Sequence, residues 1–222
     1  MTFLQQITLR CPVCDTRFES LVAKVTNFLG GRRSDFREEA SGKHALPYLV
    51  HACTECGYAG QTDQFYSSVD LAADVRQRIR SELRQPLATA AARLGFIPAS
   101  EKYEAIAKIA EWQFADARRV AELWLRAAWC SEDEHDVEAE RYFRRKAARA
   151  FTKALEDFEG VAADERAAIT YLVGELWRRI GDDRQASRWF TRVPDEIVDF
   201  KAQELFVAMA RRQSERPEEW LP

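Results

Sequence analysis

Cys11-Pro12-Val13-Cys14 and Cys53-Thr54-Glu55-Cys56-Gly57 decide the N-terminal fold of this 222-residue chain. The two Cys-x2-Cys pairs are separated by 38 residues. Each pair forms a tight turn that presents two sulfur atoms, and two such turns surround one tetrahedral ion. Gly57 follows the second pair at a place where the turn often needs a positive φ. We therefore predict one metal site with Cys11, Cys14, Cys53 and Cys56 as its ligands.

The residue types predict a Zn²⁺ ion with a structural role. A catalytic zinc keeps an open coordination position, whereas four thiolates fill the coordination sphere, so we predict no enzymatic activity. Iron is the alternative metal, because Cys53-Thr54-Glu55-Cys56-Gly57-Tyr58 is similar to a rubredoxin knuckle and four thiolates also accept iron. Two disulfides or four free thiols are the remaining interpretation.

The composition makes nucleic acid and membranes poor candidates for a partner. Lys and Arg total 33 against 36 Asp and Glu, a net charge of -3, so the chain lacks the basic excess that nucleic-acid binding leaves. No apolar run approaches the roughly 20 residues of a membrane span. Met1 to Arg10 does not resemble a signal peptide, and we expect a cytoplasmic protein without membrane contact.

The first 69 residues are predicted to form a small β unit. Strands are expected over residues 3–10, 18–28 and 45–52, with a glycine-containing loop at residues 30–35. A β-ribbon with one cysteine turn at each end is a zinc-ribbon or rubredoxin-like arrangement. His51 is expected to lie on the surface of the last strand, two residues before Cys53.

From about residue 70 the apolar period changes from 2 to 3.6, which predicts a helical domain over residues 70–213 and a polar tail over 214–222. Pro86 is expected to interrupt the first helix, and Ser100 to be the N-cap of the next. Further helices are predicted over residues 116–129, 164–180, 183–193 and 195–212. A long helix is also predicted between a polar loop at 131–136 and Gly160, which would end it. The fold class is α+β, mostly α.

Two pairs of these helices resemble each other. Tyr171-Leu172-Val173-x3-Trp177 parallels Leu123-Trp124-Leu125-x3-Trp129, which indicates an internal repeat. The second copy is similar to the tetratricopeptide pattern, with small residues that let paired helices approach. Two repeats are few for such an array, so residues 70–112 and 195–212 would cap it, or a second chain would do so in a homodimer.

The whole chain resembles the uncharacterised bacterial family known as domain of unknown function 2225. The resemblance rests on both cysteine pairs, on Ser34-Asp35-Phe36-Arg37, on Pro47-Tyr48 and on Leu125-Arg126-Ala127-Ala128-Trp129. It implies a four-thiolate metal site fused to tetratricopeptide-like helices, and it implies no established activity.

We predict a metal-stabilised interaction scaffold that binds a protein or peptide through its helical repeats. Alternatives are an iron redox protein and a nucleic-acid-binding zinc ribbon that uses Arg32, Arg33, Arg37 and Lys43. Asp35 and Arg37 are candidates because loop residues serve recognition or turn formation, and Asp35-Phe36 would otherwise dock the loop on the helices. Cys130 is expected to be a small buried hydrophobe. The candidate partner-binding residues are Asp35, Arg37, Tyr48, Arg145 and Arg149.

Overall fold

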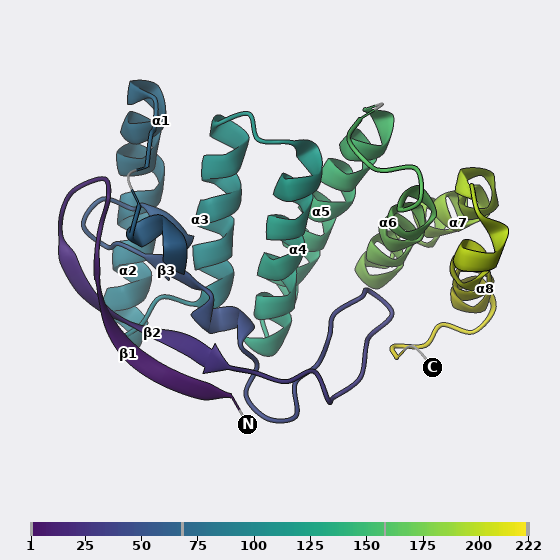
Figure 1. Ribbon diagram of the computed structural model, residues 1–222, viewed down its shortest axis with the longest axis horizontal. Helices are drawn as coiled ribbons and strands as arrows, with labels where there is room; N and C mark the ends of the chain where they lie inside the picture. Colours follow the sequence, from purple (N-terminus) through teal and green to yellow (C-terminus); the bar gives the residue numbers. More distant parts are fainter. Residues whose placement is uncertain (1, 68, 158, 221–222) are drawn as a thin grey trace.

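The computed structural model describes residues 2–67, 69–157 and 159–220, and it shows two β-hairpins beside a row of helices (Figure 1). Strands β1 (Phe3–Arg10) and β2 (Arg17–Val25) form the first antiparallel hairpin, and β3 (Val50–Ala52) and β4 (Ala59–Gln61) form the second. The expected α+β, mostly α fold class is confirmed.

The cysteine turns therefore lie at the tips of two separate two-stranded sheets, not at the two ends of one ribbon. The prediction of a strand over residues 45–52 is wrong for its first half, which forms a 3₁₀ turn at Leu46–Tyr48. Pro47 explains the difference, because it has no N–H to donate to a strand ladder. The second strand also ends at Val25, earlier than predicted.

A continuous helical segment follows the hairpins. It consists of α1 (Ala73–Arg78), a π-helical turn (Ile79–Leu83) and α2 (Arg84–Leu94), so Pro86 does not interrupt it as predicted. The N–H of Arg84 reaches back to the carbonyl of Ile79, and this wider turn makes room for the proline ring two residues later. The helical segment ends at Gly95.

The remaining helices are α3 (Ala99–Trp112), α4 (Ala117–Asp133), α5 (Val137–Glu156), α6 (Arg166–Ile180), α7 (Asp183–Arg192) and α8 (Phe200–Glu215). Ser100 is not an N-cap: it lies inside α3, and its hydroxyl donates to Glu134. Asp116, Asp136 and Asp182 cap α4, α5 and α7 by accepting a backbone N–H. Because α4 continues to Asp133, the predicted loop after it is shorter than 131–136. The helix α5 ends at Glu156, before Gly160.

Consecutive helices from α3 to α7 pack on one another. At Gly174 a Cβ atom would lie 2.6 Å from the ring of Phe190, so α6 and α7 approach as closely as the repeat pattern indicates. The class of helical repeat stays a prediction, as does the division into residues 1–69, 70–213 and 214–222. None of the described helices is long and apolar enough to cross a bilayer.

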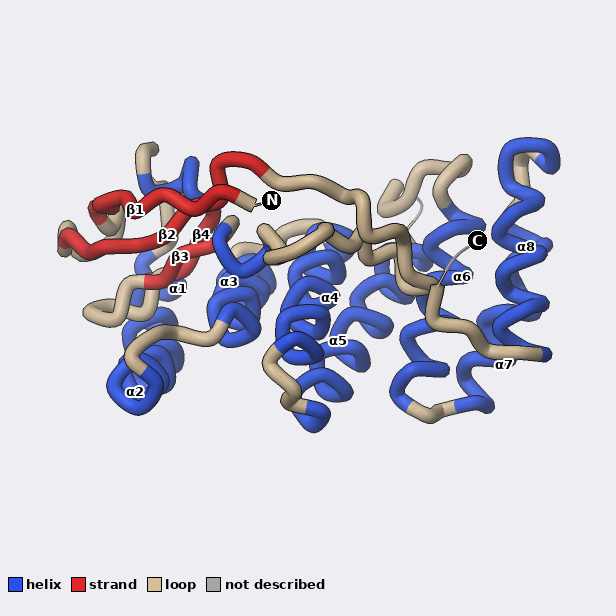
Figure 2. Tube along the Cα trace, turned by 90° about the horizontal axis from the view of Figure 1, so that it is seen from below, coloured by secondary structure: helices blue, strands red, loops and turns tan. Residues whose placement is uncertain are grey.

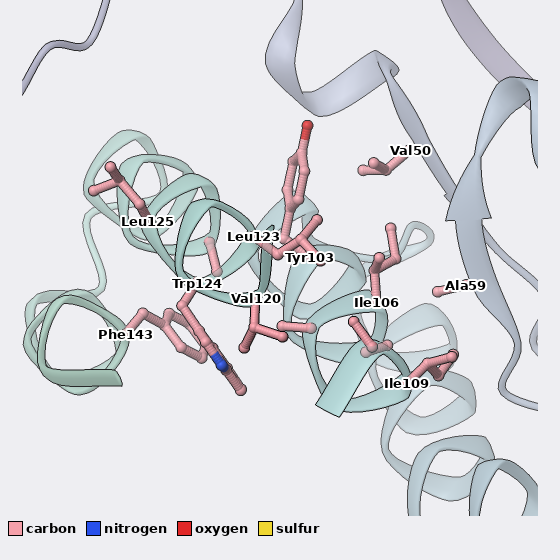
Figure 3. Packing of buried hydrophobic residues seen from close by; sticks show 14 of the residues in the cluster. Val50, Ala59, Tyr103, Ile106, Ile109, Val120, Leu123, Trp124, Leu125 and Phe143 are labelled. Atoms are coloured by element: carbon pink, nitrogen blue, oxygen red, sulfur yellow. The ribbon is translucent and has the colours of Figure 1, made fainter. Parts of the chain in front are cut away.

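One buried apolar cluster joins the hairpins to the helices. Val50 and Ala59 of the second hairpin lie beside Ile106 and Ile109 of α3, and the cluster continues through α4 to Phe143 of α5 (Figure 3). A second cluster lies among α6, α7 and α8. The second hairpin is thus fixed on the helical array by apolar burial.

Candidate metal centre

The four cysteines of the two turns converge on one point between the hairpins. Cys11 Sγ lies 3.6 Å from Cys56 Sγ, and Cys14 Sγ lies 3.6 Å from Cys53 Sγ. All four sulfur atoms are within 4.8 Å of one another. A tetrahedral ion with bonds of about 2.3 Å to sulfur needs sulfur–sulfur distances of about 3.8 Å. The arrangement therefore fits a four-thiolate metal site, and these cysteines are not joined by disulfides.

The two turns have matching backbone geometry. In the first, the N–H of Asp15 donates to the carbonyl of Cys11, and in the second the N–H of Gly57 donates to the carbonyl of Cys53, both at 2.9 Å. Asp15 and Gly57 both have positive φ, 68° and 86°. The first turn has Asp15 at the position that Gly57 holds in the second, and Asp tolerates the left-handed region better than most residues.

Hydrogen bonds among the cysteines favour the thiolate form of Cys11 and raise the pKa of Cys56. Cys11, Cys53 and Cys56 are buried, while Cys14 is partly exposed. The pKa of the Cys11 thiol is lowered to about 4, because the thiols of Cys53 and Cys56 donate hydrogen bonds to its sulfur. A thiolate is the form of cysteine that binds a metal.

The second cysteine turn rests directly on the helical segment. A Cβ atom at Gly57 would lie 2.5 Å from the backbone nitrogen of Arg84 and 2.8 Å from the carbonyl carbon of Leu83. These residues lie where the π-helical turn meets α2. Gly57 is needed both for its positive φ and for this approach of two backbones.

His51 is buried, so the expectation of a surface histidine is wrong. Its Nδ1 lies 2.7 Å from Ser20 Oγ and its Nε2 lies 2.8 Å from Thr62 Oγ1. Both ring nitrogens are occupied, and the side chain joins the two hairpins instead of coordinating the ion. Burial, together with the charge of Lys102, lowers the pKa of His51 to about 4. Cys130 is buried as expected, and burial raises the pKa of its thiol.

The loop between β2 and β3 crosses from the hairpins to the helices (Figure 2), and it carries Asp35 and Arg37 into the protein. Asp35 Oδ2 accepts hydrogen bonds from Trp129 Nε1 at 2.9 Å and from Arg144 Nη1 at 2.7 Å. Arg37 donates to both carboxylate oxygens of Asp133, at 2.8 and 2.7 Å. Asp35 and Arg37 thus dock the loop on α4 and α5, which is the alternative to a recognition role that the sequence left open for these loop residues.

The charges around Asp35 form a buried polar network. Burial acts to raise the pKa of Asp35, but the guanidinium groups of Arg144 and Arg179 outweigh it and hold the pKa well below its usual range. Arg144 also pairs with Glu132 and Glu140, at 3.0 and 2.8 Å.

Further along the loop, Ser34 donates to Glu175 of α6 at 2.6 Å. Arg144 belongs to a run of arginines on α5, a pattern typical of a solvated helix face, yet it is fully buried. Its position beside Phe143 and three residues before Ala147, on the apolar face of α5, is the signal that could have found it.

The other candidate residues lie elsewhere. Tyr48 is partly buried and lines a cleft beside the hairpins. Arg145 and Arg149 are exposed on α5, without an ion-pair partner among the residues that the structure describes. In the basic loop considered for nucleic acid, Arg33 and Arg37 are buried in ion pairs, so these two guanidinium groups are not free for phosphate.

Fold and site together define a protein class in which two hairpins present a four-cysteine metal-type centre against a helical array. The chain belongs to the family described as "Uncharacterized protein conserved in bacteria (DUF2225)", whose sequence model matches residues 4–216. No curated protein and no solved structure matches the chain.

Proposed function

We propose that the protein is a non-enzymatic interaction scaffold, in which Zn²⁺ at the four cysteines stabilises the hairpins and the adjacent cleft binds a segment of a protein partner. The cleft is the observation that carries the proposal. Its volume is about 640 Å³, and it is bounded by β2, the segment before the second cysteine turn, the turn between α2 and α3, and the end of α4.

A structural role suits the ion because each hairpin is small. A two-stranded sheet is at best marginally stable alone in water. Structural Zn²⁺ supplies on the order of 10–16 kcal/mol of apparent free energy to the folding of small domains. Since four thiolates leave no open coordination position, the ion is assigned no catalytic step.

The rim of the cleft carries apolar side chains that no neighbouring segment covers fully. Leu21 is 45% exposed and Phe96 is 62% exposed. On the inner side, Lys102 Nζ donates to the carbonyls of Pro47 and Val50, at 3.1 and 3.4 Å. An apolar side chain inserted between Leu21 and Phe96 would remove this surface from water.

Acidic side chains indicate the charge of the partner. Glu19 and Glu134 line the same cleft without an ion-pair partner among the described residues, whereas the carboxylate of Asp133 there is already paired with Arg37. We assign the cleft to a protein segment with an apolar or aromatic anchor next to a basic residue, because opposite charges favour correct docking.

Metal analysis tests the first half of the proposal. We expect natively purified protein to contain one equivalent of zinc, and a Cys53→Ser variant to lose the metal together with the order of the hairpins while the helical signal in circular dichroism is largely retained. Native protein that contains iron would instead support the redox interpretation, and protein without metal would contradict both.

Site-specific photo-crosslinking in cells tests the second half. A photoreactive phenylalanine at Leu21 or at Phe96 is expected to give the same discrete adduct. Phe114 provides the matched control, because it is 93% exposed and lies outside the cleft. The cleft proposal fails if adducts are absent at both cleft positions or equally abundant at Phe114.

A further inference from the structure

The loop between β2 and β3 contains a small hairpin of its own. Arg32 and Glu38 form an antiparallel bridge, and the N–H of Arg33 donates to the carbonyl of Arg37 at 2.8 Å. The chain reverses at Phe36, which has a positive φ of 66°. One edge of this hairpin, the Arg32–Ser34 side, is left to pair with another extended segment.

That edge is occupied by the segment that follows α8, which turns back toward the loop (Figure 1). Arg33 and Trp220 form an antiparallel bridge, and the N–H of Ser34 donates to the carbonyl of Glu219 at 2.8 Å. Glu219 and Trp220 therefore pair with the Arg32–Ser34 edge through a single β-bridge.

The side chains around the Arg32–Ser34 edge favour a carboxylate and an aromatic ring in the segment that pairs with it. Arg33 Nη2 lies 2.6 Å from the carboxylate of Glu219, and Arg179 Nη1 lies 3.8 Å from it. Arg33 is itself held by Glu132 of α4, so its guanidinium is fixed before a ligand binds. The Trp220 ring lies beside Gly31, at 3.7 Å from the place of a Cβ atom there, which is ordinary van der Waals contact. A carboxylate followed by an aromatic residue in an extended segment matches this surface.

The present occupant leaves part of its surface in contact with solvent. Gln213 and Arg212 hold Glu218, but Glu219 keeps 56% of its side chain exposed and Trp220 is 50% exposed. A half-exposed aromatic ring realises only part of its burial energy. The acceptor edge lies inside residues 4–216, which the family model matches, whereas residues 218–220 lie beyond them.

We propose that the Arg32–Ser34 edge is a strand-acceptor site for an extended segment of a partner protein that carries a carboxylate followed by an aromatic residue. Residues 218–220 occupy this site within the chain and compete with the partner. Addition of a strand to an open sheet edge is a common mode of peptide recognition. The acceptor edge and the cleft share no lining residue, so this inference does not depend on the proposed function of the cleft.

A peptide-binding measurement on full-length protein tests the inference. The probe is a fluorescein-labelled peptide with the sequence of residues 215–220, Glu-Arg-Pro-Glu-Glu-Trp, followed by fluorescence anisotropy. The full-length variant Glu219→Lys/Trp220→Ala releases the edge and changes only exposed side chains. The control Glu215→Lys/Val198→Ala makes the same kinds of change at exposed positions outside the site, 67% and 65% exposed.

We expect the peptide to bind the Glu219→Lys/Trp220→Ala protein at least tenfold more tightly than it binds the wild type or the control. A peptide that carries the same Lys and Ala replacements should not bind any of the three proteins. Equal affinity for the three proteins, or equal binding of the altered peptide, would overturn the inference. A wild-type dimer that dissociates in Glu219→Lys/Trp220→Ala would also overturn it, because the segment would then belong to a second copy of the chain.

Discussion

Replacement of Asp35 by alanine probes the polar network that docks the loop on the helices. Asp35 and Arg144 are both fully buried, and their ion pair measures 2.7 Å. The substitution leaves the Arg144 guanidinium without one carboxylate and leaves Trp129 Nε1 without its acceptor.

The expected loss of stability follows from these contacts. Removal of one partner of a buried ion pair costs about 3–5 kcal/mol, because it leaves an uncompensated charge. Arg144 retains Glu132 and Glu140, so we expect the lower end, about 3 kcal/mol. For a chain of this length, about 2–4 °C per kcal/mol gives a fall in melting temperature of about 6–12 °C.

Urea unfolding followed by circular dichroism measures this change. Asp70→Ala is the control, since Asp70 is exposed, and it should change the free energy of unfolding by less than about 0.5 kcal/mol. In the double variant Asp35→Ala/Arg144→Met neither charge remains, so we expect less destabilisation than in Asp35→Ala alone. A loss below about 1 kcal/mol for Asp35→Ala, or strict additivity in the double variant, would refute the reasoning.

Three further predictions concern the same elements. The pKa of Asp35 in the folded protein lies below its unfolded value of about 3.9, so the unfolded chain binds more protons between the two values. The free energy of unfolding should therefore fall as the pH drops below about 4, and it should fall less steeply in Asp35→Asn. Urea midpoints measured across this pH range test both statements. Gly57→Ala should lower the free energy of unfolding by more than the roughly 1–2 kcal/mol that a left-handed alanine costs, whereas Gly95→Ala should lower it by only that amount. The reason is that φ is positive at both positions, but an added Cβ atom meets backbone only at Gly57. Equal melting temperatures of the two variants would contradict this. Arg145→Glu/Arg149→Glu should leave the unfolding free energy within about 1 kcal/mol of wild type, and a larger loss would show that these side chains are not free.

Several features could be predicted from local sequence signals. The Cys-x2-Cys spacing predicts two turns that each present two sulfurs, and the structure brings all four together. The 3.6-residue period places the helical segments, and the helix predicted over 164–180 ends where Gly181 adopts the left-handed conformation. Each of these signals lies within a few residues, so no knowledge of distant contacts is needed.

Other features depend on pairs of residues far apart in the chain. Asp35 lies 109 residues before Arg144 and 94 residues before Trp129, and the loop composition gives no sign of either partner. Both ring nitrogens of the buried His51 are occupied, by Ser20 of β2 and by Thr62, which directly follows β4.

The sequence by itself therefore determined the cysteine cluster and the mostly helical class, because these follow from local spacing and periodicity, and its motifs resemble those of the family. The tertiary structure alone decided that Arg33, Ser34, Asp35 and Arg37 of the loop after β2 are buried on the helices and that residues 219–220 return to the edge of this loop. The physical reason is that burial of a charged group is stable only when its partners are placed around it, and that placement exists only in the folded chain.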